Sequence, residues 1–201
     1  MIAVIDYGMG NLRSVEKALQ SVGGDARVTS SPSDITSAER IVLPGVGAFK
    51  CAMEELRQRD LITPILDGFK KNKPYLGICL GLQLLLSESE EAPGTPGLGL
   101  IPGRVRRFST AGIKVPHMGW NSVKIKKDGC PLLTGIKDAS HFYFVHSYYA
   151  DPEEKTIVMA TTQYGCEFAS MIWKDNIFAM QFHPEKSQGI GLKVLENFVK
   201  C

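Results

Sequence analysis

Short apolar runs alternate with longer amphipathic stretches through the first half of the chain. Four of these runs are rich in bulky or β-branched apolar residues and are too short to form helices, which is typical of buried strands. They are MIAVID at 1–6, ARVT at 26–29, RIVLP at 40–44 and YLGI at 75–78. We therefore expect these runs to form the strands of a sheet.

The stretches between those runs have the spacing of helices. One helix is expected to begin after Asn11, a preferred N-cap residue, and to stop at Gly23. Its apolar face consists of Leu12, Val15, Leu19 and Val22. Helical patterns continue to about Lys71 with an interruption near Pro64, and a further helix is expected from Leu80 to about residue 87. Strands and helices in alternation predict a parallel sheet with helices on both faces.

The second half of the chain has a different pattern. A Pro/Gly-rich segment at 90–103 predicts a loop. Alternating runs then predict antiparallel strands that continue or flank the sheet; they are RVRRF, SVKIK, HFYFVHSYY, IVMATTQ, FASMIW and NIFAMQF. A last helix is expected over about 189–199. Nothing in the sequence resembles a repeat or an interdomain linker, so we expect one domain over 1–201.

Composition excludes several classes of partner. The chain has 201 residues, 44% of them hydrophobic, and a net charge of +2, which suggests neither a nucleic acid nor a membrane surface as partner. The basic runs at 104–107 and 124–127 are interleaved with apolar residues, as in solvated strand faces. The segment GMGNLR lacks the third glycine of a dinucleotide-binding loop, because Arg13 stands there.

The cysteines and the N-terminus bear on the compartment. There are five cysteines, widely spaced and without a C-x-x-C pair, which indicates free thiols in a reducing compartment. We find no signal peptide at the N-terminus and no apolar run of about 18 residues that could cross a membrane. A cytoplasmic location is therefore expected.

Candidate chemistry begins at Cys79, which stands between two glycines in GICLG at the junction of a predicted strand and helix. The serine version of this pattern is a tight elbow that holds a strained, exposed nucleophile. The start of the following helix favours the thiolate. The alternative is a buried, inert cysteine, which is common for free thiols but leaves two glycines at a strand end unexplained.

A thiolate nucleophile needs a base, and His183 is the best candidate. It lies in MQFHPEKS at the end of a predicted strand, and Glu185 is placed to orient its imidazole. Cys79, His183 and Glu185 thus form a candidate triad. The alternative for His183 is a packing role, which we assign to His141 and His146 in their aromatic run.

The same chemistry needs an oxyanion hole. One donor is expected from the backbone N–H of Leu80, directly after the candidate nucleophile. A second is expected from PGVG at 44–47, whose glycines let backbone amides turn toward a ligand at the carboxyl end of a strand. The alternative is an ordinary glycine turn.

The elbow, the glycine loop and HPE, in this order, resemble the class I (triad-type) glutamine amidotransferases over nearly the whole chain. The resemblance implies a flavodoxin-like α/β fold with a mixed, mostly parallel central sheet flanked by helices. It also implies hydrolysis of L-glutamine through a Cys79 thioester, with no metal and no organic cofactor. The implied oxyanion donors are Leu80 and the loop at Val46 and Gly47. The implied substrate contacts are Gly47, Gln83, Glu91, Ser147 and Tyr148.

Further motifs resemble one branch of this family, namely DYGMGN, LPGVGAF, GICLGLQLL, SEEAPG, PHMGWN and FHPEKS. That branch supplies ammonia to a (β/α)8-barrel cyclase in histidine biosynthesis. The resemblance therefore implies a heterodimer with such a cyclase, lyase activity in the complex, and an oxyanion loop that switches conformation when partner and ligand bind. The implied interface residues are Asn11, Met118, Trp120 and Lys186.

Three other functions remain open at this point. The chain could be the glutaminase subunit of another ammonia-using synthase, a cysteine hydrolase acting on peptides, or a non-catalytic binding subunit that kept the fold. The complete candidate triad argues against the last of these. Loss of glutamine-dependent turnover on removal of the Cys79 thiol would separate the enzyme from the scaffold.

Overall fold

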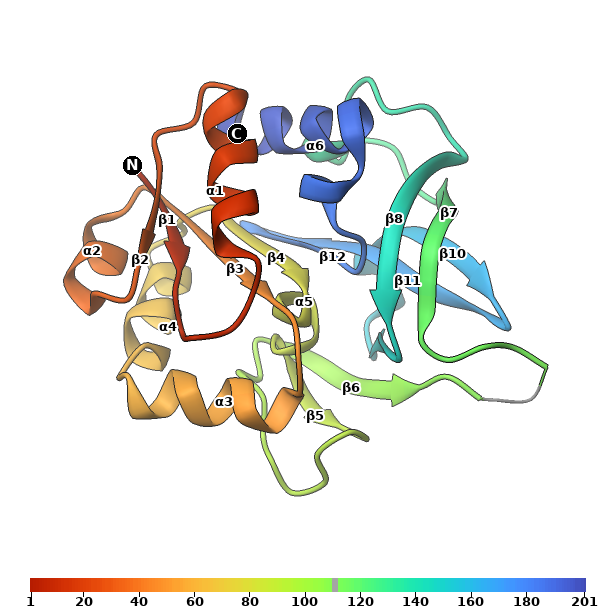
Figure 1. The fold of residues 1–201 in the computed structure, drawn as a ribbon, viewed down its shortest axis with the longest axis horizontal. Coiled ribbons are helices and arrows are strands. Elements are labelled where there is room, and N and C mark those ends of the chain that lie inside the picture. The colour runs from red at the N-terminus through yellow and green to blue at the C-terminus, as the bar shows by residue number, and fades with distance from the viewer. Residues whose placement is uncertain (110–111) are drawn as a thin grey trace.

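The computed structural model describes residues 1–109 and 112–201, with a nine-stranded sheet at the centre of the molecule (Figure 1). Its strand order is β2-β1-β3-β4-β12-β11-β10-β7-β8, and β5, β6 and β9 form a smaller sheet. The strands are β1 Ile2–Ile5, β2 Ala26–Thr29, β3 Arg40–Gly45, β4 Tyr75–Cys79, β5 Leu86–Ser89, β6 Ile101–Arg107, β7 His117–Ile125, β8 Ser140–His146, β9 Tyr148–Pro152, β10 Val158–Tyr164, β11 Cys166–Lys174 and β12 Ile177–Met180. The helices are α1 Leu12–Ser21, α2 Pro32–Ser37, α3 Phe49–Gln58, α4 Ile62–Lys70, α5 Leu80–Gln83 and α6 Gln188–Lys200.

The large sheet is parallel in one half and antiparallel in the other. Strands β2, β1, β3, β4 and β12 run parallel to one another. Strands β11, β10, β7 and β8 continue the sheet in antiparallel order. The predicted mixed sheet flanked by helices is confirmed, but β12 was expected among the antiparallel strands. It instead pairs parallel with β4 on one side and antiparallel with β11 on the other.

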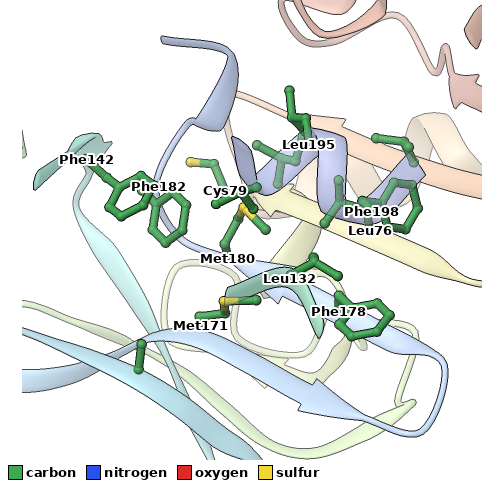
Figure 2. Packing of buried hydrophobic residues seen from close by; sticks show 14 of the residues in the cluster. Leu76, Cys79, Leu132, Phe142, Met171, Phe178, Met180, Phe182, Leu195 and Phe198 are labelled. Atoms are coloured by element: carbon green, nitrogen blue, oxygen red, sulfur yellow. The ribbon is translucent and has the colours of Figure 1, made fainter. Parts of the chain in front are cut away.

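Alternate residues of the central strands supply two apolar cores. In β1, Ile2 and Val4 face one core, while Ala3 and Ile5 face the other. Helices α1 and α6 cover the first face, and α3 and α4 cover the second (Figure 1). Figure 2 shows part of the first core, in which Cys79 lies among side chains of β12, the segment after it and α6. Burial on both faces explains why these strands are apolar without interruption.

Two expected helix boundaries are wrong. The helix after Cys79 ends at Gln83 rather than near residue 87, and Leu86–Ser89 forms β5 beside β6. The carbonyls of the three leucines at 84–86 accept hydrogen bonds from the backbone N–H groups of residues 98–101, so they are not available to continue the helix. The break between α3 and α4 falls at 59–61 instead of at Pro64, which occupies the first turn of α4, where its missing N–H costs no hydrogen bond.

Two strand boundaries also differ from expectation. β6 begins at Ile101, inside the segment expected to be a loop, and HFYFVHSYY divides at Ser147 into β8 and β9. These two strands enter different sheets, since β8 pairs with β7 and β9 pairs with β6. Because the chain divides here, residues 147 and 148 lie near Cys79, where the candidate site is found.

The carboxyl ends of β3, β4 and β12 lie side by side. The register pairs Gly45 of β3 with Cys79, and Met180 of β12 with Ile78. Ligands in parallel α/β sheets bind outside the carboxyl ends of the strands. The pairing of β12 with β4 therefore brings the segment that begins at Gln181 level with Cys79. No helix of the described residues is long and apolar enough to cross a membrane.

Candidate active site

Cys79 lies at the tight turn between β4 and α5, with backbone angles φ 55° and ψ −106°. A positive φ is rare for a residue with a side chain and marks a strained, over-determined position. A Cβ at Gly81 would lie 1.8 Å from the carbonyl oxygen of Leu43, and a Cβ at Gly77 would lie 2.8 Å from the carbonyl oxygen of Gly81. Both flanking glycines are therefore required by close backbone packing, as in a nucleophile elbow.

His183 and Glu185 follow β12 and form a buried pair. The Nδ1 of His183 lies 2.8 Å from Oε1 of Glu185, and each side chain is 2% exposed. The backbone of His183 is also held, because its N–H donates to the carbonyl of Tyr143 and its carbonyl accepts from the hydroxyl of Ser187. The carboxylate of Glu185 thus orients the imidazole, and two further hydrogen bonds hold the backbone that carries it.

The pKa of His183 shows which neighbours dominate. Burial alone lowers the pKa of an imidazole, but the favourable interactions of the ring with Cys79 and Glu185 outweigh burial and raise the pKa of His183 to about 10. His183 is therefore an imidazolium at neutral pH. Its Nε2 is buried and has no hydrogen-bond partner among the described residues, which leaves that nitrogen available for proton transfer.

A cavity of about 420 Å³ opens beside Cys79. This volume lies within the range of small-molecule sites, roughly 300–1,000 Å³. Its walls are formed by Val46, Gly47, Cys79, Leu80, Gln83, Glu91, Pro116, Val145, His146, Ser147, Tyr148 and Lys186. The structure thus gathers every expected oxyanion and substrate residue around the candidate nucleophile. It adds three that the sequence did not suggest, since apolar residues and a histidine in a strand are ordinary core patterns: Pro116, Val145 and His146.

The glycine loop after β3 is held from behind by Tyr7. The buried hydroxyl of Tyr7 donates to the carbonyl of Pro44 at 2.9 Å. A Cβ at Gly45 would lie 2.3 Å from that hydroxyl, and Gly47 has a φ of 105°. The loop therefore needs glycine at both positions, one for close approach and one for its backbone conformation. Which amide of this loop faces a substrate remains a prediction.

Polar side chains on the cavity wall are already partly bonded. Gln83 Nε2 donates to the carbonyl of Tyr148 at 2.9 Å and to Oε1 of Gln181 at 3.1 Å. Glu91 Oε2 accepts from the backbone N–H of Phe49 at 2.9 Å, at the start of α3. Gln83 thereby has both amide hydrogens engaged and retains its oxygen as an acceptor.

A buried histidine pair lies directly behind the cavity wall. His117 Nδ1 lies 3.0 Å from His146 Nε2, and His146 Nδ1 lies 2.8 Å from the carbonyl of Tyr148. At the other end, Asn121 Nδ2 lies 3.2 Å from His117 Nε2. Sequence reasoning gave His146 only a packing role. The pairing of β7 with β8, which places these two histidines opposite each other, has no signal in the sequence.

The expected interface residues lie in different settings. Met118 is 63% exposed and Trp120 is 47% exposed, and with Val46 they are the exposed large hydrophobic residues of the described chain. Asn11 is exposed at the start of α1, where its side chain accepts from Ser14. Lys186 lies on the cavity wall and within 5.9 Å of the Tyr143 ring. A partner role for these four residues stays a prediction.

The site contains thiol, imidazole, carboxylate and amide groups. Within 1–109 and 112–201, no cluster of three or more His, Cys, Asp or Glu side chains is arranged to hold a metal ion. All five cysteines are free. Cys79 lies on the cavity wall, and the buried His183–Glu185 pair interacts with it from outside the lining residues. A thiol with an imidazole and a carboxylate beside it is the set of groups used in nucleophilic catalysis.

Comparison with known proteins identifies the class. The sequence model of the family "Glutamine amidotransferase class-I" matches residues 3–201. The chain belongs to this family, as the elbow, the glycine loop and HPE predict. A solved structure described as a glutamine amidotransferase shares the fold with a TM-score of 0.77 and 17% identity, covering 100% of both chains.

Relatives of higher identity point to one branch. A protein of Methanothermobacter thermautotrophicus named "Imidazole glycerol phosphate synthase subunit HisH" is 56% identical over 202 residues, covering 100% of this chain and 98% of its own length. The HisH subunit of Moorella thermoacetica is 54% identical over 197 residues, covering 98% of this chain and 93% of its own length. The prediction of this branch from DYGMGN and PHMGWN is confirmed.

Proposed function

We propose that this chain is the glutaminase subunit of an imidazole glycerol phosphate synthase. It hydrolyses L-glutamine and passes the ammonia to a (β/α)8-barrel cyclase in histidine biosynthesis, in the cytoplasm. The observation that carries the proposal is the strained Cys79 on the wall of a 420 Å³ cavity, beside the buried His183–Glu185 pair. The full-length HisH relatives support the choice of synthase.

In the first stage, the Cys79 thiolate attacks the side-chain carbonyl carbon of L-glutamine. The developing oxyanion accepts hydrogen bonds from the Leu80 N–H and from an amide at Val46 or Gly47, which line the same cavity. The C–N bond then breaks as the imidazolium of His183 donates its Nε2 proton to the leaving nitrogen. Ammonia departs and a glutamyl thioester remains on Cys79.

In the second stage, His183 is neutral and accepts a proton from water as that water attacks the thioester. The C–S bond breaks, glutamate is released, and the thiolate–imidazolium pair is restored. Glu185, 2.8 Å from Nδ1, keeps the ring in one orientation and stabilises its charged form through both stages. No metal or organic cofactor takes part.

The polar wall of the cavity matches the ends of glutamine. The free oxygen of Gln83 and the carboxylate of Glu91 suit the α-ammonium group, and Lys186 adds a positive charge to the same wall. Gly47, Ser147 and Tyr148 supply backbone groups for the rest of the amino-acid moiety. The small volume and the polarity of the cavity thus favour a single free amino acid over an extended peptide.

The partner surface lies next to the cavity. Met118 and Trp120 project from β7, and Val46 projects from the oxyanion loop; all three are exposed apolar side chains. Asn11 and Lys186 complete the proposed contact. Ammonia reacts as a nucleophile only while it is unprotonated, so a cyclase docked here would receive it without passage through bulk water.

The test is glutamate release from L-glutamine, with and without a cyclase subunit and its ligand. Cys79→Ala is expected to abolish glutamine-dependent turnover while ammonia-dependent synthesis by the complex persists. Cys130→Ala is the matched control, because Cys130 is also a buried free thiol but does not line the cavity. If glutamine-dependent turnover were undiminished in Cys79→Ala, the chain would be a non-catalytic binding subunit. If the unmodified protein cleaved peptides, it would be a cysteine hydrolase.

A further inference from the structure

Gln181 is a fully buried polar residue that the proposed reaction has not yet used. It follows β12, two positions before His183, and has 0% exposure. Its side chain lies between Gln83 and Cys79: Oε1 accepts from Gln83 Nε2 at 3.1 Å, and Nε2 donates to Cys79 Sγ at 3.5 Å. A buried amide that contacts the sulfur of a candidate nucleophile is placed to act on its charge.

The direction of these hydrogen bonds is set by one backbone carbonyl. The oxygen of Tyr148 can only accept, so the Gln83 atom 2.9 Å away must be its NH2 group. The second hydrogen of that NH2 points to Gln181, which must therefore present its oxygen to Gln83. The remaining end of the Gln181 amide, its NH2 group, then faces Cys79.

The reverse orientation is excluded by the contact with Gln83. A flipped Gln181 would place its NH2 against the NH2 of Gln83, and its oxygen against the sulfur of Cys79. A thiolate would be repelled by that oxygen, whereas it is stabilised by an N–H donor. The Tyr148 carbonyl is itself held by His146, whose Nδ1 lies 2.8 Å away. The orientation is therefore built into the fold before any substrate binds.

A second group near the sulfur has the opposite effect. The carbonyl of Val145 lies 3.8 Å from Cys79 Sγ and can accept a hydrogen bond from the thiol form alone. The Gln181 N–H is closer, at 3.5 Å, and carries a partial positive charge toward the sulfur. Of these two contacts, the shorter one favours the ionised form.

We propose that Gln181 is a further catalytic residue, whose side-chain N–H stabilises the Cys79 thiolate in an orientation that the Tyr148 carbonyl imposes through Gln83. The proposal rests on the proposed role of Cys79 as the nucleophile. It assigns His183 and Gln181 complementary roles: the imidazolium supplies charge and later a proton, and the amide supplies a neutral donor that gives up no proton. Gln181 thus keeps a donor beside the sulfur both as the thiolate attacks and as the C–S bond breaks.

The test compares variants of nearly the same volume. Gln181→Met removes the donor, and Gln163→Met makes the same change at an exposed position of β10. The readout is the rate of alkylation of Cys79 by iodoacetamide as a function of pH, followed by mass spectrometry of the peptide that contains Cys79. This readout separates Cys79 from the other four cysteines.

Gln181→Met is expected to slow alkylation at pH 7 about tenfold and to move its midpoint about one pH unit upward, as loss of one hydrogen bond to a charged group implies. Gln163→Met is expected to leave the rate and the midpoint unchanged. In glutaminase assays, Gln181→Met should lower kcat with KM within about twofold. An alkylation midpoint equal to that of the unmodified protein in Gln181→Met would overturn the proposal.

A second measurement does not depend on the folding of a Gln181 variant. The ¹⁵N side-chain amide resonance of Gln181 in the unmodified protein should shift as Cys79 ionises, and that shift should vanish in Cys79→Ala. A resonance that does not respond to the ionisation of Cys79 would overturn the proposal. Full glutaminase activity in Cys79→Ala would instead overturn the proposed function, so the two failures are distinguishable.

Discussion

Two buried histidine sites lie close together in this protein and titrate in opposite directions. Contacts with Cys79 and Glu185 overcome the effect of burial and raise the pKa of His183 to about 10. Burial lowers the pKa of His117 to about 4. Burial, with smaller effects of neighbouring charges, lowers the pKa of His146 to about 3. At neutral pH the first site is charged and the second is neutral.

The pKa values of these histidines differ because of the groups that contact each ring, since all three side chains are buried. His183 faces a carboxylate and a sulfur that can carry negative charge. The other two histidines face each other, an amide and a backbone carbonyl, and His117 stacks on Phe144 and Tyr164. A buried imidazole without an anion stays neutral because nothing offsets the loss of hydration.

The neutral pair has a single consistent arrangement of protons. The Tyr148 carbonyl can only accept, so His146 carries its proton on Nδ1 and accepts on Nε2. His117 therefore donates from Nδ1 and accepts on Nε2 from Asn121. The His183–Glu185 pair thus supplies a proton for the reaction. The His117–His146 pair instead holds the cavity wall at Tyr148 in place.

The largest expected effect comes from removing the charge of Glu185. Glu185→Gln keeps the shape of the side chain but no longer stabilises the imidazolium, so the pKa of His183 should fall. We expect kcat for glutaminase to drop about 10³-fold, or about 4 kcal/mol, as when the carboxylate of a catalytic triad is neutralised. Steady-state kinetics and ¹H–¹⁵N NMR of the ring measure the two effects.

Glu55→Gln is the matched control, since Glu55 forms an exposed ion pair with Arg59 at 2.9 Å. It should change kcat by less than about twofold. Equal kcat values for the two variants would mean that the charge of Glu185 plays no part in the reaction.

The next effect concerns the neutral pair. His146→Phe leaves the buried Nδ1–H of His117 without a partner, and we expect a loss of about 3 kcal/mol in the free energy of unfolding, measured with urea. His141→Phe, on the same strand but exposed, should lie within about 0.5 kcal/mol of the unmodified protein. Replacing His117 and His146 together should cost less than the sum of the single changes, and strict additivity would contradict the hydrogen bond between them.

The pH dependence of stability follows from the lowered pKa values of His117 and His146. The unfolded chain takes up protons below about pH 6.5, whereas the folded pair does not until about pH 4, so acid favours unfolding in that window. The contribution is fully present above pH 6.5 and is lost as the pH falls. We expect the pair to account for about 4 kcal/mol between pH 7 and pH 5, about 2 kcal/mol from each histidine.

The measurement is urea denaturation at both pH values, on the unmodified protein and on the variant with both residues replaced by Phe. Carboxylates contribute equally to the two proteins and cancel in the comparison. His183 acts in the opposite sense, because its raised pKa gives a contribution that is lost as the pH rises toward 10. An equal loss of stability in the two proteins would show that the pair is not neutral.

The smallest effect lies at the outer end of the chain of hydrogen bonds. Asn121 donates to His117 and to the carbonyl of Gln163 at 3.0 Å, from a half-buried position on β7. Asn121→Ala should lower the free energy of unfolding by about 1 kcal/mol. Asn11→Ala, at an exposed helix start, should lower it by a few tenths at most, measured in the same urea titrations. If Asn121→Ala lowered the free energy of unfolding no more than Asn11→Ala does, Asn121 would not stabilise the histidine pair.

Several features of the site could be predicted from local sequence alone. The strand before Cys79 and the two glycines around it were predictable because their constraints act within a few residues. The spacing of His183 and Glu185 likewise permits one hydrogen bond without knowledge of the fold. Three successive leucines misled the prediction at 84–86, because local pattern did not separate a buried strand from a helix there.

The sequence by itself determined the apolar strands, the elbow and the family, because hydrophobic period and backbone sterics are local properties. The tertiary structure alone decided that β12 pairs with β4, which brings Gln181 to a cysteine 102 positions earlier. It also decided that His117 meets His146 across β7 and β8. Such contacts depend on strand order and register, which arise from packing the whole chain at once and leave no mark on the residues nearby.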